Sequence, residues 1–312
     1  MNRTVRFGIS LLATIIAFNW SVYAQGPKGD EWLRKPVDDR TFRTYLDFFV
    51  YDQSLPFETQ TIDTSVSEGL RKEHLSFQGI STDRVFAILY SLEGIAFEKT
   101  PALILLHGGT AKGKSSGYAV ALAEVLARAG FIVLAIDMQL FGERATPLLT
   151  KFTEVEKHDR LYNQKSTYLA WIAQLVKDVG RSVDFLASQR NVDAKRVGLL
   201  GISRGAEAGI IVAGADRRLT PVVLFFGGHF DALETGHLPA ACPANYIGRI
   251  SPRPLLMING EADSDYDKVT AVDPLYARAR QPKKIIWSVA GHMGFTDRDL
   301  SEMTEWLRDH VK

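Results

Sequence analysis

The chain has 312 residues with 37 basic and 36 acidic side chains, so its formal net charge is +1. This balance gives no support for a nucleic-acid or membrane-surface partner, both of which favour a strongly basic protein. The single cysteine, Cys242, excludes an intramolecular disulfide, so we expect it to be a small buried apolar residue in a fold that rests on its apolar core.

Residues 1–24 have the pattern of a cleavable secretory signal. Two arginines precede a mostly apolar stretch, Phe7 to Phe18, and small or compact residues stand at Val22 and Ala24. The apolar stretch is shorter than the roughly 20 residues that a membrane-spanning helix needs. We therefore expect cleavage after Ala24, export to the periplasm or the medium, and no membrane anchor in the mature chain.

Residues 25–66 are expected to form an N-terminal arm with one helix. The spacing of Phe42, Leu46 and Phe49 predicts that this helix runs from Thr41 to Tyr51. Two strands, "HLSFQGI" and "RVFAILYSL", follow and open a single domain over residues 67–312.

From about Pro101, short apolar runs alternate with stretches of helical spacing. The runs are "ALILLHGG", "FIVLAID", "RVGLLGIS", "PVVLFFGG", "RPLLMING" and "KIIWSVAGH", and the helices are expected at 117–129, 169–188, 206–213, 265–280 and 297–311. This alternation predicts an α/β fold with a mostly parallel sheet and helices on both faces. The irregular segment 229–252 is long for a loop, and we expect it to form a small cap over a site.

The strongest motif is G-x-S-x-G at residues 201–205, where an apolar strand meets a helix rich in small residues. A sharp strand-to-helix turn would expose the hydroxyl of Ser203, and glycines on either side remove Cβ atoms that would clash. Ser203 is therefore the candidate nucleophile.

A serine nucleophile needs a base, and the base needs an acid to orient it. His292 is the candidate base because it closes the strand "KIIWSVAGH" and precedes a helix. Asp263, in the spacing G-x-x-D after Gly260, is the favoured acid, with Asp265 and then Asp231 as alternatives.

Together with the His107-Gly108-Gly109 loop, these motifs resemble the α/β-hydrolase superfamily. The stretches "DMQLFGERATP" and "GISRGAEAG" are similar to its dienelactone-hydrolase and acetyl-xylan-esterase-like branch, and the resemblance spans about residues 84–312. It implies an oxyanion hole made by the backbone N–H groups of Gly109 and Arg204. Dienelactone hydrolases proper use a cysteine nucleophile, whereas this chain has Ser203, so their lactone substrate is not carried over.

The loop after "ALILLHGG" admits a second interpretation, because "GGTAKGKS" fits the nucleotide-binding pattern G-x-x-x-x-G-K-[ST] and Asp137 follows the next strand. Export argues against nucleotide binding, and that interpretation leaves the ordered serine, acid and histidine unexplained. We therefore expect His107 to brace the loop, and Lys112 and Lys114 to be solvent-facing or to lie at the pocket rim.

The candidate pocket residues are His107, Phe141, Glu143, Arg144 and His229. Arg204 is a candidate for contact with a substrate carboxylate, and for the charged members the alternative is a structural ion pair. The sequence thus predicts an exported serine hydrolase that cleaves a small-molecule carboxylic ester without a cofactor or metal. Thioester or peptide cleavage and a non-catalytic binding protein on the same fold are the alternatives.

Overall fold

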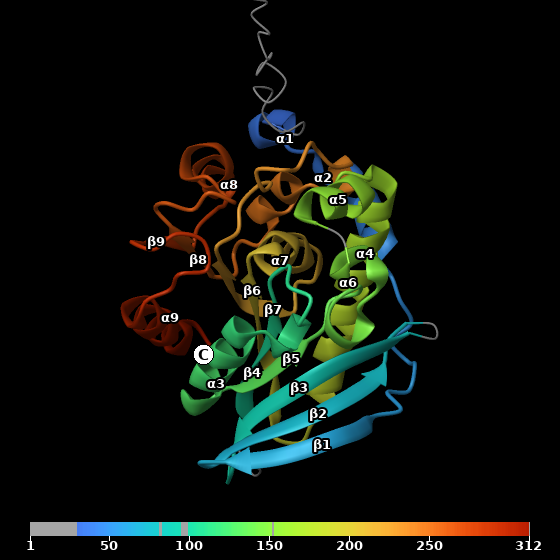
Figure 1. Ribbon diagram of the computed structural model, residues 1–312, viewed down its shortest axis with the longest axis vertical. Helices are drawn as coiled ribbons and strands as arrows, with labels where there is room; N and C mark the ends of the chain where they lie inside the picture. The colour runs from blue at the N-terminus through green and yellow to red at the C-terminus, as the bar shows by residue number, and fades with distance from the viewer. Residues whose placement is uncertain (1–29, 81–82, 95–98, 152, 312) are drawn as a thin grey trace, which may run out of the picture.

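The computed structural model describes residues 30–80, 83–94, 99–151 and 153–311 (Figure 1). The expected signal at residues 1–24 lies outside this part of the chain. Within it, no helix combines the length and the apolar character that a membrane crossing requires.

The described residues contain nine strands in one mixed, mostly parallel sheet with the order β1-β2-β3-β5-β4-β6-β7-β8-β9. The first three strands are antiparallel, β3 pairs antiparallel with β5, and the strands from β4 to β9 are parallel. Their bounds are β1 (Gln60–Ser67), β2 (Leu70–Gln78), β3 (Arg84–Leu92), β4 (Thr100–Leu106), β5 (Ile132–Ile136), β6 (Val192–Ile202), β7 (Leu219–Phe225), β8 (Leu255–Gly260) and β9 (Lys283–Ser288).

Helices cover both faces of this sheet (Figure 1), as the sequence predicts. The longest helix, α6, and α7 pack with α2 in one apolar cluster, whereas α3 and α9 pack in a second cluster on the other face. The helices are α1 (Asp30–Arg34), α2 (Asp39–Leu46), α3 (Gly117–Arg128), α4 (Pro147–Thr150), α5 (Glu154–Lys157), α6 (Lys165–Ser188), α7 (Arg204–Ala215), α8 (Asp273–Arg278) and α9 (Asp297–His310).

The central strand β4 shows why the apolar runs are continuous. Ile104 and Leu106 belong to the cluster under α6 and α7, while Leu103 and Leu105 belong to the cluster under α3 and α9. Because both faces of a parallel strand are buried, neither face can carry polar residues. The expected α/β class is confirmed.

The N-terminal segment differs from the expectation of a single helix. Helix α2 ends at Leu46, and a separate 3₁₀ turn, Asp47–Phe49, replaces the expected last turns of the helix to Tyr51. Strand β1 lies almost wholly within the segment expected to be an arm. All eight of its residues are exposed, so the strand carries no apolar pattern that would reveal it.

Segment 229–252, expected to be a small cap over a site, is mostly packed into the core, and Asp231, Ala232 and Leu233 at its start line a cavity. It forms three 3₁₀ turns, Pro239–Ala241, Pro243–Asn245 and Ile247–Arg249, and its apolar side chains join the cluster of α6 and α7. Cys242 is fully buried here, and burial raises the pKa of its thiol, in line with the structural role expected for it.

The helix expected over 265–280 begins later. The Asp267 carboxylate accepts the N–H groups of Val269 and Thr270 and so caps a π-helical turn, Lys268–Val272, before α8 starts. The residues just after β8 therefore remain in an irregular loop, which leaves Asp263 at the strand end.

Candidate active site

Ser203 occupies the sharp turn between β6 and α7. Its φ is +52° and its ψ is −118°, a backbone conformation that a residue with a side chain rarely adopts. A Cβ atom on Gly201 would lie 2.3 Å from the carbonyl oxygen of Gly205, and one on Gly205 would lie 2.4 Å from that of His107. Both glycines of the motif are thus required by backbone contacts, and the turn leaves Ser203 on the wall of a cavity.

The structure brings Ser203, His292 and Asp263 together from the ends of three strands. The Oγ of Ser203 lies 2.9 Å from Nε2 of His292, and Nδ1 of His292 lies 2.9 Å from Oδ2 of Asp263. When Nδ1–H donates to the carboxylate, Nε2 is left as an acceptor for the serine hydroxyl. This arrangement lets the imidazole take the serine proton.

Asp263 is held for this contact by the backbone. Its Oδ1 accepts the N–H groups of Asp265 at 2.9 Å and Tyr266 at 3.0 Å, which leaves Oδ2 for His292. The alternative acid, Asp265, is more than half exposed and lies 3.5 Å from Nε2, the nitrogen that also contacts the serine. The other alternative, Asp231, belongs to a separate cluster.

The loop after β4 lies against the serine turn. A Cβ atom on Gly108 would be 3.4 Å from the Cβ of Ser203, and one on Gly109 would be 3.6 Å from the Cβ of Arg204. The two candidate oxyanion donors, the N–H groups of Gly109 and Arg204, therefore belong to neighbouring segments, and the second lies at the N-terminus of α7. Helix N-termini favour negative charge.

His107 is fully buried and braces this loop, as expected, so it does not belong to the pocket lining. Its Nε2 accepts the N–H of Met138 at 3.1 Å, so the neutral ring carries its proton on Nδ1, which donates to the carbonyl of Gly108 at 2.6 Å. Burial lowers the pKa of His107, which keeps the ring neutral. That carbonyl shares a peptide unit with the N–H of Gly109, so the imidazole fixes the direction of that N–H.

Lys114, the lysine of the nucleotide-like pattern, is buried and not solvent-facing or at a rim. Its Nζ donates to Asp137 at 2.6 Å and also contacts Glu143, while its backbone N–H donates to the other Asp137 oxygen at 2.8 Å. The amine that would meet a phosphate is thus bonded to two carboxylates. Lys112 is exposed, as expected.

A cavity of about 330 Å³ opens beside Ser203 and His292. One wall, Glu154, His158 and Tyr162 from the segment between β5 and α6, was not predicted. The other, Asp231, Ala232 and Leu233, comes from the start of segment 229–252, which was expected to lie over a site. Lys157 to Tyr162 contains a π-helical turn, His158–Tyr162. No strand end or glycine motif marks this segment, so the sequence offered no signal for it.

The remaining pocket candidates lie elsewhere. Phe141 is buried against the ring of His107, and Glu143 contacts His74 as well as Lys114. Arg144 forms ion pairs with Asp178 at 2.6 Å and Asp83 at 2.9 Å, and His229 is buried with its ring stacked on Phe230. The ion-pair alternative thus describes Glu143 and Arg144, whereas Phe141 and His229 are buried outside the cavity lining. Distance along the chain from a strand end does not tell which way a side chain points.

The side chain of Arg204 lies in a buried charged cluster and is not free for a substrate. One terminal nitrogen contacts Glu207 and Glu234, and the other contacts Asp231. The guanidinium also lies 4.0 Å from the centre of the Tyr162 ring. Arg204 therefore forms structural ion pairs and is not placed to contact a substrate carboxylate.

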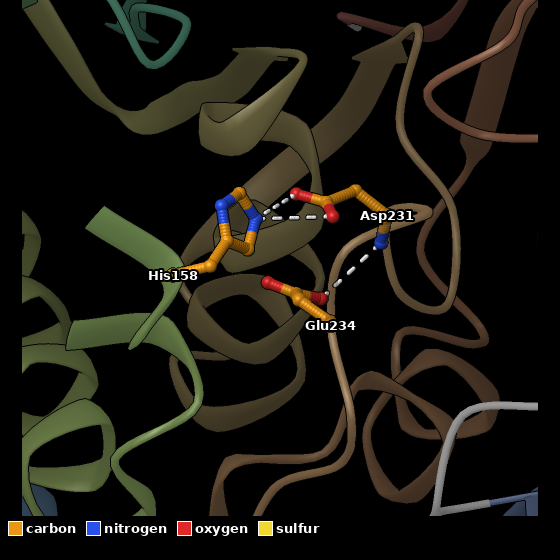
Figure 2. A group of neighbouring side chains, drawn as sticks. All are labelled: His158, Asp231 and Glu234. Carbon is orange, nitrogen blue, oxygen red and sulfur yellow. Dashed lines mark hydrogen bonds and ion pairs between the residues drawn. The ribbon is translucent and has the colours of Figure 1, made fainter. Parts of the chain in front are cut away.

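Figure 2 shows His158 beside two acids of this cluster, Asp231 and Glu234. His158 Nε2 lies 2.8 Å from an Asp231 oxygen, and Glu234 accepts the backbone N–H of Asp231 at 3.2 Å. Burial alone would raise the pKa of Asp231, but the charge of Arg204 and the hydrogen bond from His158 lower it to about 2. Burial raises the pKa of Glu234 well above its usual range despite Arg204.

An imidazole and two carboxylates are also a donor set that suits a divalent cation. In this structure the guanidinium of Arg204 already contacts both carboxylates. A metal ion at this position would have to displace Arg204. The cluster is therefore better described as two acids paired with a buried arginine.

Comparison of the structure with solved proteins defines the class as the α/β-hydrolase fold. A cold-adapted esterase from an Arctic intertidal metagenomic library has a TM-score of 0.63 at 16% identity, covering 83% of this chain and all of its own. Acetyl xylan esterase 1 from Thermoanaerobacterium sp. JW/SL YS485 has a TM-score of 0.65 at 16% identity, and the acetyl xylan esterase from Paenibacillus sp. R4 has 0.66 at 15%. Both cover 91% of this chain and 99% of their own.

The family model of the dienelactone hydrolases matches residues 97–300, so the chain belongs to the dienelactone hydrolase family and is a hydrolase. No curated protein matches the sequence significantly. The expected superfamily and branch are confirmed.

Proposed function

We propose that this hydrolase cleaves small-molecule carboxylic esters through an acyl-enzyme, with Ser203 as nucleophile, His292 as base and Asp263 as the acid that orients the base. The observation that carries the proposal is the chain of two 2.9 Å contacts that ends at a serine held at φ +52°. The structural likeness to proteins described as esterases supports an ester as the bond that is cleaved.

In the first half-reaction the Ser203 oxygen attacks the ester carbonyl carbon while Nε2 of His292 takes the hydroxyl proton. The carboxylate of Asp263 holds the ring with Nδ1–H toward itself and stabilises the imidazolium. The negative carbonyl oxygen is bound by the N–H groups of Gly109 and Arg204. A single donor of this kind contributes about 10²–10³ in rate.

Collapse of the tetrahedral intermediate breaks the bond to the alcohol oxygen, which takes the proton back from His292 and leaves. A water molecule then gives a proton to Nε2 and attacks the acyl carbon. Release of the carboxylic acid returns the proton to Ser203. Acid, base and nucleophile are thus restored after each cycle.

Hydrolysis of p-nitrophenyl acetate by purified protein tests this proposal. We expect turnover by the unaltered chain and a loss of roughly 10⁶ in kcat in Ser203→Ala, the scale seen when such a nucleophile is removed. Ser301→Ala, which removes an exposed hydroxyl on α9, is the matched control and should retain full activity. Equal activity of Ser203→Ala and the unaltered chain would refute the assignment.

We also infer that the chain is exported and cleaved after Ala24. The support is the charged start, the short apolar stretch and the small residues before Gln25. N-terminal sequencing of the protein recovered outside the cytoplasm should begin at Gln25. Recovery of uncleaved chain from the cytoplasm alone would contradict this inference.

A further inference from the structure

The charges on the cavity wall are unevenly distributed. Among the described residues that line the cavity, Arg204 is the single arginine or lysine. Three acids, Glu154, Asp231 and Asp265, line the same cavity. A substrate in this cavity therefore meets more negative than positive side chains.

The positive charge of Arg204 is already used by the protein. Both of its terminal nitrogens contact carboxylates, and the Tyr162 ring covers one face of the guanidinium. Its side chain is only 5% exposed. A substrate carboxylate could bind it only by displacing an acid such as Asp231 or Glu234, and the displaced acid would then lack its buried cation.

Two of the three acids, in contrast, remain accessible, although Glu154 also pairs with Lys157 at 2.7 Å. The side chains of Asp265 and Glu154 are 56% and 63% exposed. Asp265 also lies 3.5 Å from Nε2 of His292, so its charge is close to the reacting atoms. The second histidine of the cavity, His158, points Nε2 at Asp231 and so adds no free donor for an anion.

We propose that this cavity selects esters that carry a positively charged group, such as an ammonium, and rejects esters of the same shape that carry a carboxylate. The proposal rests on the proposed ester hydrolysis and adds the charge class of its substrate. Charged groups across a site act both on encounter and on the bound state, and like charges at close range oppose binding.

Three acetate esters of similar size and different charge test this proposal: acetylcholine, the neutral 3,3-dimethylbutyl acetate and the anionic 4-acetoxybutanoate. Acid release is followed by titration at constant pH. We expect kcat/KM to fall in that order, with roughly ten-fold between the cation and the anion at low salt. The ratio should shrink as salt is raised, because the acids at the rim are exposed.

Two variants test whether the acids of the cavity cause the preference for the cationic ester. Asp231→Asn removes a negative charge and frees one side of Arg204, so kcat/KM for the anionic ester should rise relative to that for the neutral ester. Asp265→Asn removes an exposed charge with little risk to folding and should change the ratio in the same direction. Glu31→Gln, an exposed acid on α1 that does not line the cavity, is the control for net charge and should leave the ratio unchanged.

The outcomes separate the two proposals. Hydrolysis of the neutral ester with equal kcat/KM for cation and anion, or a preference for the anion, would overturn the charge selectivity and leave ester hydrolysis standing. A shift in Glu31→Gln as large as in Asp265→Asn would also overturn it, because the effect would then come from net charge. A folded protein that cleaves none of the three esters would contradict the proposed function and this inference with it.

Discussion

The imidazole of His107 donates from Nδ1 to the carbonyl of Gly108 at 2.6 Å, and this contact sets the direction of the next peptide N–H. The ring itself is fixed because its Nε2 accepts the N–H of Met138, which follows the adjacent strand β5. A side chain that never reaches the cavity thus positions a group proposed to bind the transition state.

Replacing His107 with alanine should therefore lower kcat more than it raises KM. Without the imidazole the Gly108–Gly109 peptide can rotate, and the loss should approach the roughly 10²-fold cost of one oxyanion donor. Steady-state kinetics on p-nitrophenyl acetate measure both constants, and thermal unfolding measures the cost to stability. An unchanged kcat in a folded variant would show that the peptide is held without the imidazole.

Substitution of Asp263 and substitution of Asp265 should have different effects on kcat. Asp263→Asn removes the carboxylate that receives Nδ1–H and favours the wrong tautomer of His292, so we expect kcat to fall by about 10⁴. Asp265→Asn should keep kcat on the neutral p-nitrophenyl acetate within about ten-fold, because this carboxylate faces Nε2 from 3.5 Å and is exposed. The reverse order of losses would assign the orienting role to Asp265.

Lys114 and Lys112 should differ in their effect on stability. Lys114→Ala leaves Asp137 buried without its cation, a change that typically costs about 3–5 kcal/mol. Lys112→Ala, at an exposed position in the same loop, should change the free energy of unfolding by less than about 0.5 kcal/mol. Urea unfolding measures both. Equal stability of the two variants, together with ATP hydrolysis lost in Lys114→Ala, would favour the nucleotide interpretation.

The buried cluster around Arg204 should make stability depend on pH. Burial raises the pKa of Glu234 well above 4.5, so the folded chain holds this proton more tightly than the unfolded chain does. The stability that this group contributes is complete below about pH 4.5 and is lost as pH rises through the folded-state pKa.

We therefore expect Glu234 to lower the free energy of unfolding as pH rises above about 5, and Glu234→Gln to remove this contribution. Both proteins keep a pH dependence, because burial also raises the pKa of Glu207 and lowers the pKa of His107 and His237, which act in opposite directions. Urea unfolding between pH 5 and pH 8 compares the two proteins. A variant with the same slope as the unaltered chain would show that Glu234 does not titrate in this range.

The sequence predicts those features that follow from the order of strands and helices along the chain. Ser203 and His292 follow apolar strands, and the carboxyl ends of parallel strands meet at one edge of the sheet, so their proximity could be expected. Asp263 could be favoured from its distance to Gly260, but only the backbone N–H groups of Asp265 and Tyr266 distinguish it from the next acid.

Other features depend on side-chain direction and long-range packing, which sequence spacing does not encode. Arg144 follows a strand as closely as a pocket residue would, yet it turns to Asp178 on α6. His158 reaches the cavity through a π-helical turn in a segment without a motif. Strand β1 is exposed throughout and pairs at the sheet edge, so no apolar pattern in the sequence predicts it.

The central claim is that His292 activates Ser203 for attack on a carbonyl. A fluorophosphonate probe tests it most directly, because the probe forms a covalent bond only with an activated serine, and peptide mass spectrometry locates the adduct. We predict one adduct on Ser203 in the unaltered chain and none in a folded His292→Asn variant. An unlabelled Ser203, or equal labelling of the two proteins, would contradict the account.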